Sequence, residues 1–209
     1  MKKTLVALAA LLSLPAFAGG LEALEGFIRS ARSGHSEFTQ VVTAPARQGQ
    51  AARSKTSTGT FDFERPSRFR FTYRKPFEQV IVADGETLWL YDQDLNQVTS
   101  RKQALVLGAT PAALIASSPD LESLKKDFEL HALAERDGLQ WVQATPKAKE
   151  GQLHSMKAGF RGNELAVLEI LDGFGQRSVL TFTGMQVNAG VPADAFRFTP
   201  PKGVDVVKQ

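Results

Sequence analysis

Residues 68–75 read Arg-Phe-Arg-Phe-Thr-Tyr-Arg-Lys, and this alternation decides the fold. Successive side chains of a β-strand point to opposite faces, so Phe69, Phe71 and Tyr73 share one face, opposite the cationic and polar residues between them. Residues 60–64, Thr-Phe-Asp-Phe-Glu, alternate in the same way and put Phe61 and Phe63 on one face. Two such strands predict a sheet with an aromatic face that must be covered.

The chain around this stretch contains further runs with the length and pattern of strands. They are Gln79–Ala83, Thr87–Tyr91, Gln97–Arg101, Phe128–Leu133, Gln140–Thr145, Ser155–Phe160, Leu165–Leu171 and Arg177–Asn188. Asp-Gly pairs at residues 84–85, 137–138 and 172–173 each lie between two such runs, which is a strong hairpin signal. Successive hairpins predict an antiparallel meander. For Thr87–Tyr91 the pattern leaves open which face points inward, because a shift of one residue inverts the faces.

Three short segments have helical signals. Leu21, Leu24, Phe27 and Ile28 form an apolar stripe at helical spacing, with Gly34 as the expected stop. Thr110-Pro111 and Ser118-Pro119 each resemble an N-cap followed by Pro at the first helical position, and so predict two short helices inserted in the β chain. The segment Ala44–Ser57, rich in Ala, Gln, Arg and Lys, is interpreted as a mobile connection whose role the sequence does not reveal.

A meander with one aromatic face could close into a barrel, pair with a second sheet, or curl around helices. The three amphipathic helices favour a mainly β (α+β) fold in which a curled sheet is filled by helices. Phe and aliphatic side chains would then line the inside, and charged side chains the outside.

The first 18 residues are interpreted as a signal peptide rather than a buried N-terminal helix. Lys2 and Lys3 precede the apolar run Leu5–Leu14, and Ala16-Phe17-Ala18 has the small-x-small pattern of a cleavage site. Cleavage is therefore predicted between Ala18 and Gly19, which leaves residues 19–209 as a single domain. In a bacterium this places the mature protein in the periplasm. Because the chain has no cysteine, it cannot itself be a lipoprotein.

Composition and motifs argue against several classes of protein. The balance of 25 basic and 22 acidic residues is too even for a nucleic-acid footprint. The alternation at Arg68–Lys75 also separates charges from aromatics, whereas a base-stacking platform presents both together. His35, His131 and His154 have no ligand at metal-binding spacing, so no metal site is predicted and the histidines are expected on the surface or in loops. The sequence has neither a G-x-S-x-G elbow nor a Gly-Lys pair for a P-loop. We therefore expect no catalytic residues.

Six short motifs, taken in order, resemble a known family, the periplasmic outer-membrane lipoprotein carriers (LolA). They are Phe38-Thr39-Gln40, Gly59-Thr60-Phe61 leading to Arg65-Pro66, Phe69-Arg70-Phe71, Asp84-Gly85-x-x-Leu88-Trp89-x-Tyr91, Thr110-Pro111-x-x-Leu114-Ile115 and Phe196-x-Phe198-x-Pro200-Pro201. Each motif alone is weak. Their order, behind a signal peptide and without a cysteine, is specific, and the resemblance covers essentially all of the mature chain.

This resemblance implies an unclosed antiparallel β-barrel with a helical lid over a hydrophobic cavity, and no cofactor. The family collects acylated lipoproteins from the inner-membrane ABC transporter LolCDE and delivers them to the outer-membrane receptor LolB. Arg65 is similar in position to the residue that bonds the lid backbone and holds the empty cavity closed. The residues expected to line the acyl-chain cavity are Phe61, Phe63, Phe69, Phe71, Tyr73, Leu114 and Ile115. We expect a monomer with no nucleic-acid partner.

Two other classes of function stay open at this point. One is a related periplasmic lipid-binding module with other cargo, such as a glycolipid carrier or a lipid-sensing regulatory domain. The other is an enzyme that acts on acyl chains. That enzyme would need a nucleophile and a base facing the cavity, and the sequence offers no such pair.

Overall fold

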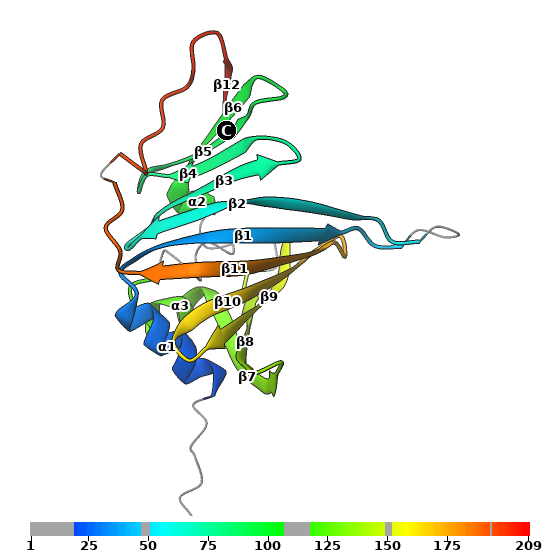
Figure 1. Ribbon diagram of the computed structural model, residues 1–209, viewed down its shortest axis with the longest axis vertical. Coiled ribbons are helices and arrows are strands. Elements are labelled where there is room, and N and C mark those ends of the chain that lie inside the picture. Colours follow the sequence, from blue (N-terminus) through cyan, green and yellow to red (C-terminus); the bar gives the residue numbers. More distant parts are fainter. Residues whose placement is uncertain (1–18, 47–50, 107–117, 149–151, 193) are drawn as a thin grey trace, which may run out of the picture.

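The computed structural model describes residues 19–46, 51–106, 118–148, 152–192 and 194–209 (Figure 1). Its helices are α1 (Gly20–Ser30), α2 (Gln103–Val106) and α3 (Leu121–Asp127). Its strands are β1 (Ser33–Thr43), β2 (Ser54–Glu64), β3 (Arg68–Lys75), β4 (Gln79–Ala83), β5 (Thr87–Asp92), β6 (Gln97–Lys102), β7 (Phe128–Arg136), β8 (Leu139–Pro146), β9 (Leu153–Arg161), β10 (Glu164–Asp172), β11 (Arg177–Val187) and β12 (Asp205–Lys208).

All twelve strands form one sheet that is not closed into a barrel, in agreement with the unclosed barrel that the resemblance implied. The strand order is β12-β6-β5-β4-β3-β2-β1-β11-β10-β9-β8-β7. Pairing of β1 with β11 joins the first six strands to the later hairpins, and β12 and β7 are the two edges. Every pair is antiparallel except that of β12 with β6, which is parallel and was not predicted.

The three predicted Asp-Gly hairpins are present. Asp137 and Gly138 both have positive φ angles, 57° and 70°, as a tight two-residue turn between β7 and β8 requires. In the other two turns the aspartate side chain accepts backbone N–H bonds: Asp84 from Glu86 and Thr87, and Asp172 from Phe174 and Gln176.

The register of β5, open from sequence, is settled by its partner strand. Ala83 pairs with Leu88 and Ile81 with Leu90, so these side chains share the face of Phe71. We call this the inner face. Trp89 lies on the opposite, outer face.

Helix α1 forms on the predicted apolar stripe, and it covers the inner face against β7–β10 and α3. It ends at Ser30, and the backbone N–H of Ala31 bonds Phe27, so the prediction of Gly34 as the stop was wrong. Gly34 lies instead in β1, where an added Cβ would lie 2.5 Å from the ring of Phe63. A small residue is required there for packing rather than for helix termination.

Two more local predictions need correction. Helix α3 begins at Leu121, not at Ser118-Pro119, because the Asp120 side chain is the N-cap and accepts the N–H of Ser123 at 2.7 Å. The connection after β1 is shorter than Ala44–Ser57, since β2 already begins at Ser54. The other inserted helix, predicted from Thr110-Pro111, falls outside the described residues.

The outer face of β3–β6 is not only charged, as the alternation had suggested, because the C-terminal segment covers part of it. Val82 is fully buried there, and Phe198 packs against Trp89 and Tyr91 with ring centroids 5.6 and 6.0 Å away. Phe196 is also buried, next to the Arg68 guanidinium. The outer face is thus polar where it meets solvent and apolar where the C-terminal segment packs on it.

Candidate functional site

The inner face carries an apolar cavity of about 240 Å³. Its lining comes from β1, β3, β4, β5, β10 and β11 and consists of Gln40, Phe69, Phe71, Tyr73, Ile81, Leu88, Leu90, Leu168, Ile170 and Leu180. Three of these, Phe69, Phe71 and Tyr73, were singled out from the alternation. Among the described residues that line the cavity, none carries a charged side chain, and this arrangement suits a hydrocarbon ligand.

The two other predicted aromatic residues lie beside the cavity rather than on its wall. Phe61 is fully buried and stacks on Phe71 with ring centroids 4.4 Å apart. Phe63 is also fully buried and lies 5.9 Å from Phe27 of α1. The aromatic face is therefore continuous from the cavity to α1, and the part under α1 is filled by the helix. Leu114 and Ile115 lie outside the described residues.

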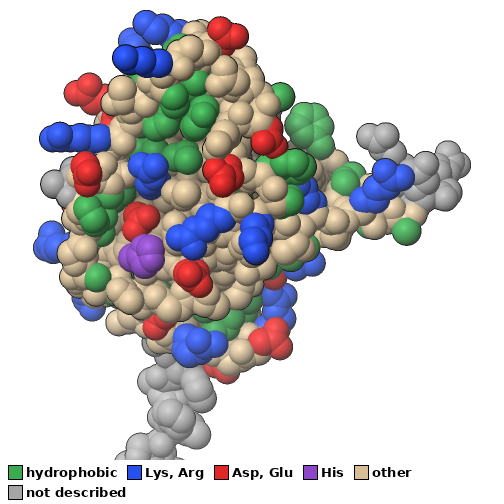
Figure 2. Space-filling view, turned by 45° about the horizontal axis from the view of Figure 1, so that its top comes forward, with side chains coloured by type: hydrophobic (Ala, Val, Ile, Leu, Met, Phe, Trp, Pro, Cys, Tyr) green, Lys and Arg blue, Asp and Glu red, His purple; other side chains and the backbone are tan. Residues whose placement is uncertain are grey.

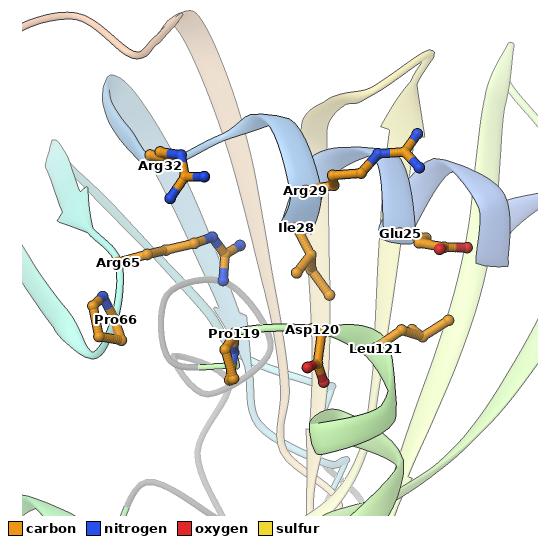
Figure 3. Close-up of a pocket in the computed structure, with 9 residues that line it drawn as sticks. All are labelled: Glu25, Ile28, Arg29, Arg32, Arg65, Pro66, Pro119, Asp120 and Leu121. Atoms are coloured by element: carbon orange, nitrogen blue, oxygen red, sulfur yellow. The ribbon is translucent and has the colours of Figure 1, made fainter.

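Arg65 follows β2 and connects two backbone segments (Figure 3). Its Nε donates to the carbonyl of Ala31, at the end of α1, and its Nη1 donates to the carbonyl of Ser118, both at 2.8 Å. The guanidinium also lies over the rings of Phe27 and Phe63, 5.4 and 5.9 Å from their centroids. Burial lowers the pKa of Arg65 to about 10, so the side chain stays protonated at neutral pH.

A groove of about 380 Å³ borders Arg65. It lies between α1 and the start of α3, and its walls include Glu25, Ile28, Arg29 and Leu121 (Figure 3). Its lining is more polar than that of the cavity. We interpret it as the surface depression beside Arg65, not as the hydrocarbon site.

Gln103 was not among the residues predicted from the sequence. It is fully buried at the start of α2, its Nε2 donates to Ser67 at 2.6 Å, and its Oε1 accepts the N–H of Gly85 at 3.0 Å. Gln103 therefore joins the turn that carries Arg65 to the β4–β5 turn. A single glutamine gives no local signal of such a role, because both partners are distant in sequence.

The described residues contain no group of three or more His, Cys, Asp or Glu side chains that could hold a metal ion. His35, expected on the surface or in a loop, lies in β1 with its Nδ1 2.6 Å from Asp62 Oδ1 on the neighbouring strand. Acidic and basic side chains are intermixed on the face drawn in Figure 2. None of the helices in the described part of the chain combines the length and apolarity that a membrane span requires.

Comparison with known proteins gives a consistent result. The model of the family "Outer membrane lipoprotein carrier protein LolA" matches residues 29–199. An outer-membrane lipoprotein carrier protein of Albidiferax ferrireducens is 61% identical over 196 residues, with 92% of each chain covered. Another, of Methylibium petroleiphilum, is 53% identical over 194 residues, with 93% of this chain and 92% of the relative covered.

Among solved structures, the LolA superfamily protein NE2245 of Nitrosomonas europaea is 13% identical to this chain. It superposes with a TM-score of 0.48 and covers 87% of this chain and 98% of its own. The family assignment rests on the sequence matches. They extend over most of the chain, and their level of identity identifies a carrier of lipoproteins and not an enzyme. The chain belongs to the outer membrane lipoprotein carrier family LolA.

Proposed function

We propose that this chain takes up acylated lipoproteins from the inner-membrane transporter LolCDE, crosses the periplasm and delivers them to the outer-membrane receptor LolB. The acyl chains occupy the cavity on the inner face. The observation that carries this proposal is the apolar lining of that cavity, which includes Phe69 and Phe71. Burial of each CH₂ contributes about 0.8 kcal/mol, so a multiply acylated protein does not leave a membrane unless a comparable apolar surface receives its chains.

The size of the cavity calls for an opening step. Pockets for drug-sized ligands measure about 300–1,000 Å³, whereas this cavity has about 240 Å³. Several acyl chains therefore enter only after the inner face opens further. Arg65 is the proposed latch of the empty form, because its bonds to the carbonyls of Ala31 and Ser118 join the end of α1 to the segment before α3. Leu114 and Ile115 stay predicted cavity residues.

Two measurements test this function. The protein is purified from the periplasm, and lipids and peptides that copurify are identified by mass spectrometry; acylated N-terminal peptides of lipoproteins are expected. A transfer assay with LolCDE vesicles and purified LolB then follows the cargo through both steps. Recovery of glycolipids alone, with no lipoprotein released from the vesicles, contradicts the proposal.

Removal of the first 18 residues is a separate expected outcome. The Lys2-Lys3 pair, the apolar run Leu5–Leu14 and Ala16-Phe17-Ala18 predict a new N-terminus at Gly19. N-terminal sequencing of the periplasmic fraction checks this. Recovery of a chain that still begins with Met1, in the membrane fraction, would show that the segment is retained.

A further inference from the structure

The inner face changes character along its strands, from apolar at the cavity to polar at the ends of β3, β5 and β11. A second pocket of about 540 Å³ lies at this polar end. Among the residues that line only this pocket, the polar ones outnumber the apolar ones: the polar residues are Lys55, Ser57, Gln79, Asp92, Asp94, Gln176 and Ser178, and the apolar residues are Val42, Pro76, Phe77 and Leu95. The two spaces share Gln40 and Tyr73 as a common wall. We call the second space the polar vestibule.

The two shared residues, Gln40 and Tyr73, carry polar groups for which the described residues offer no hydrogen-bond partner. In the described part of the chain, neither the Tyr73 hydroxyl nor the Gln40 side-chain amide makes a hydrogen bond to another side chain or to backbone. Both side chains are partly buried, and burial raises the pKa of Tyr73 to about 12, so its hydroxyl keeps its proton. Polar groups in such a position normally find a partner when a ligand excludes water. They can donate hydrogen bonds to carbonyl oxygens.

A lipoprotein has an apolar part and a polar part, as the cavity and the polar vestibule do. Its hydrocarbon chains are joined to the polypeptide through ester and amide carbonyls at the terminal cysteine, and the peptide that follows is polar. From this match we infer that Gln40 and Tyr73 bind the carbonyl groups where the acyl chains meet the peptide, and that the peptide leaves through the polar vestibule. This inference rests on the proposed carrier function. It adds the orientation of the cargo, with chain ends toward Phe69 and the peptide toward Asp94.

The alternative exit is the groove beside Arg65, at the opposite end of the inner face near α1. Charge does not favour it, because the vestibule and the groove both carry side chains of both signs. Contact with the cavity does favour the vestibule: Gln40 and Tyr73 line both spaces, whereas no residue of the groove lines the cavity. Fully buried Phe61 stacks on Phe71 of the cavity wall, and fully buried Phe63 stacks on Phe61 and lies under the Arg65 guanidinium at the groove.

The first test removes the hydroxyl. Tyr73→Phe is expected to bind a synthetic dipalmitoylglyceryl-cysteinyl peptide about three- to tenfold more weakly, as the loss of one hydrogen bond predicts. Binding is compared with that of diphenylhexatriene, a hydrocarbon probe without carbonyl groups, and the ratio of the two affinities is expected to fall. Tyr91→Phe is the matched control, because the other tyrosine of the chain packs on Phe198 at the outer face. An unchanged ratio in Tyr73→Phe and in Gln40→Leu overturns the inference.

The second test reads the orientation directly. The chain has no cysteine, so a single introduced cysteine is a unique reactive site. A lipopeptide with a maleimide on its third residue is expected to label Asp94→Cys or Gln176→Cys at least tenfold faster than Glu25→Cys in the groove. Binding with faster labelling at position 25 overturns the orientation but leaves the carrier function intact. Failure of the unmodified protein to bind the lipopeptide contradicts the carrier proposal itself, and this inference with it.

Discussion

Phe71→Glu is expected to abolish lipoprotein uptake and to lower the free energy of unfolding by several kcal/mol. Phe71 lies on the cavity wall, stacked on Phe61 and edge-on to Phe38 at a centroid distance of 5.6 Å. A carboxylate there has no cationic partner among the residues that line the cavity, and burial of an unpaired charge is expensive. An acyl chain that enters would also have to contact this charge.

Denaturant unfolding and uptake from transporter vesicles measure the two effects separately. Thr72→Glu is the matched control, because the neighbouring residue of β3 points to the outer face, where the Arg70 guanidinium donates to its hydroxyl. That variant should fold and carry cargo normally. Phe71→Leu, which keeps an apolar wall, should keep most of the uptake. If Phe71→Glu folds and transfers cargo like the unmodified protein, the assignment of the inner face is wrong.

The parts of the fold that were predictable depend on local sequence. The alternation in residues 60–64 and 68–75 assigned the inner face of β2 and β3 correctly, because period two is a property of a single strand. The Asp-Gly turns were also correct, since positive φ angles and short side-chain bonds act within four residues. A chain that forms hairpins in succession specifies most of its sheet in this way.

The predictions failed where the structure depends on contacts between segments that are far apart in the sequence. No local signal pairs the short β12 with β6, or lays Phe198 over Trp89 across the outer face. A glycine such as Gly34, placed after an apolar helical stripe, is typical of a helix end. In this protein a glycine is required at position 34 because the Phe63 ring packs closely against it. Likewise, the face of β5 was undetermined until its register with β4 was known.

The candidate site also has a part that local sequence predicts and a part that depends on distant contacts. The alternation put Phe69, Phe71 and Tyr73 on one face of an amphipathic strand, whereas a cavity at that face was implied only by the family resemblance. Leu168 and Leu180, on the opposite wall, come from strands more than 90 residues away, and their position depends on the pairing of β1 with β11. The partners of Arg65 were similarly invisible from spacing, and only the family resemblance indicated a bond to backbone near the helices.

Arg65→Leu is expected to accumulate as a loaded carrier that passes little cargo to LolB. In the empty protein the guanidinium holds the carbonyls of Ala31 and Ser118 together. Hydrogen bonds of a charged donor contribute about 1.5–3 kcal/mol each, and leucine makes neither. Loss of even one such bond, about 2 kcal/mol, from the closed form changes the ratio of closed to open molecules about thirtyfold.

Uptake should persist or improve in this variant, because acyl chains enter without first breaking those bonds. Release should suffer, since closing of the latch no longer offsets the loss of acyl contacts when the chains leave. Arg65→Lys should be intermediate: it keeps the charge but loses the planar fork that reaches two carbonyls at once. A two-step assay, with transporter vesicles first and LolB second, separates these effects.

Arg29→Leu is the control variant, because it also removes a positive charge from the groove beside Arg65. Arg29 lines the same groove, but its side chain makes no hydrogen bond or ion pair with the described residues, so its replacement should leave both steps unchanged. Unfolding is measured for all three variants, because a general loss of stability would slow uptake and release together. A selective defect in release, graded from lysine to leucine at position 65, assigns the latch to Arg65. Normal delivery by Arg65→Leu at unchanged stability would instead reduce Arg65 to a residue that fixes the end of α1 against the sheet.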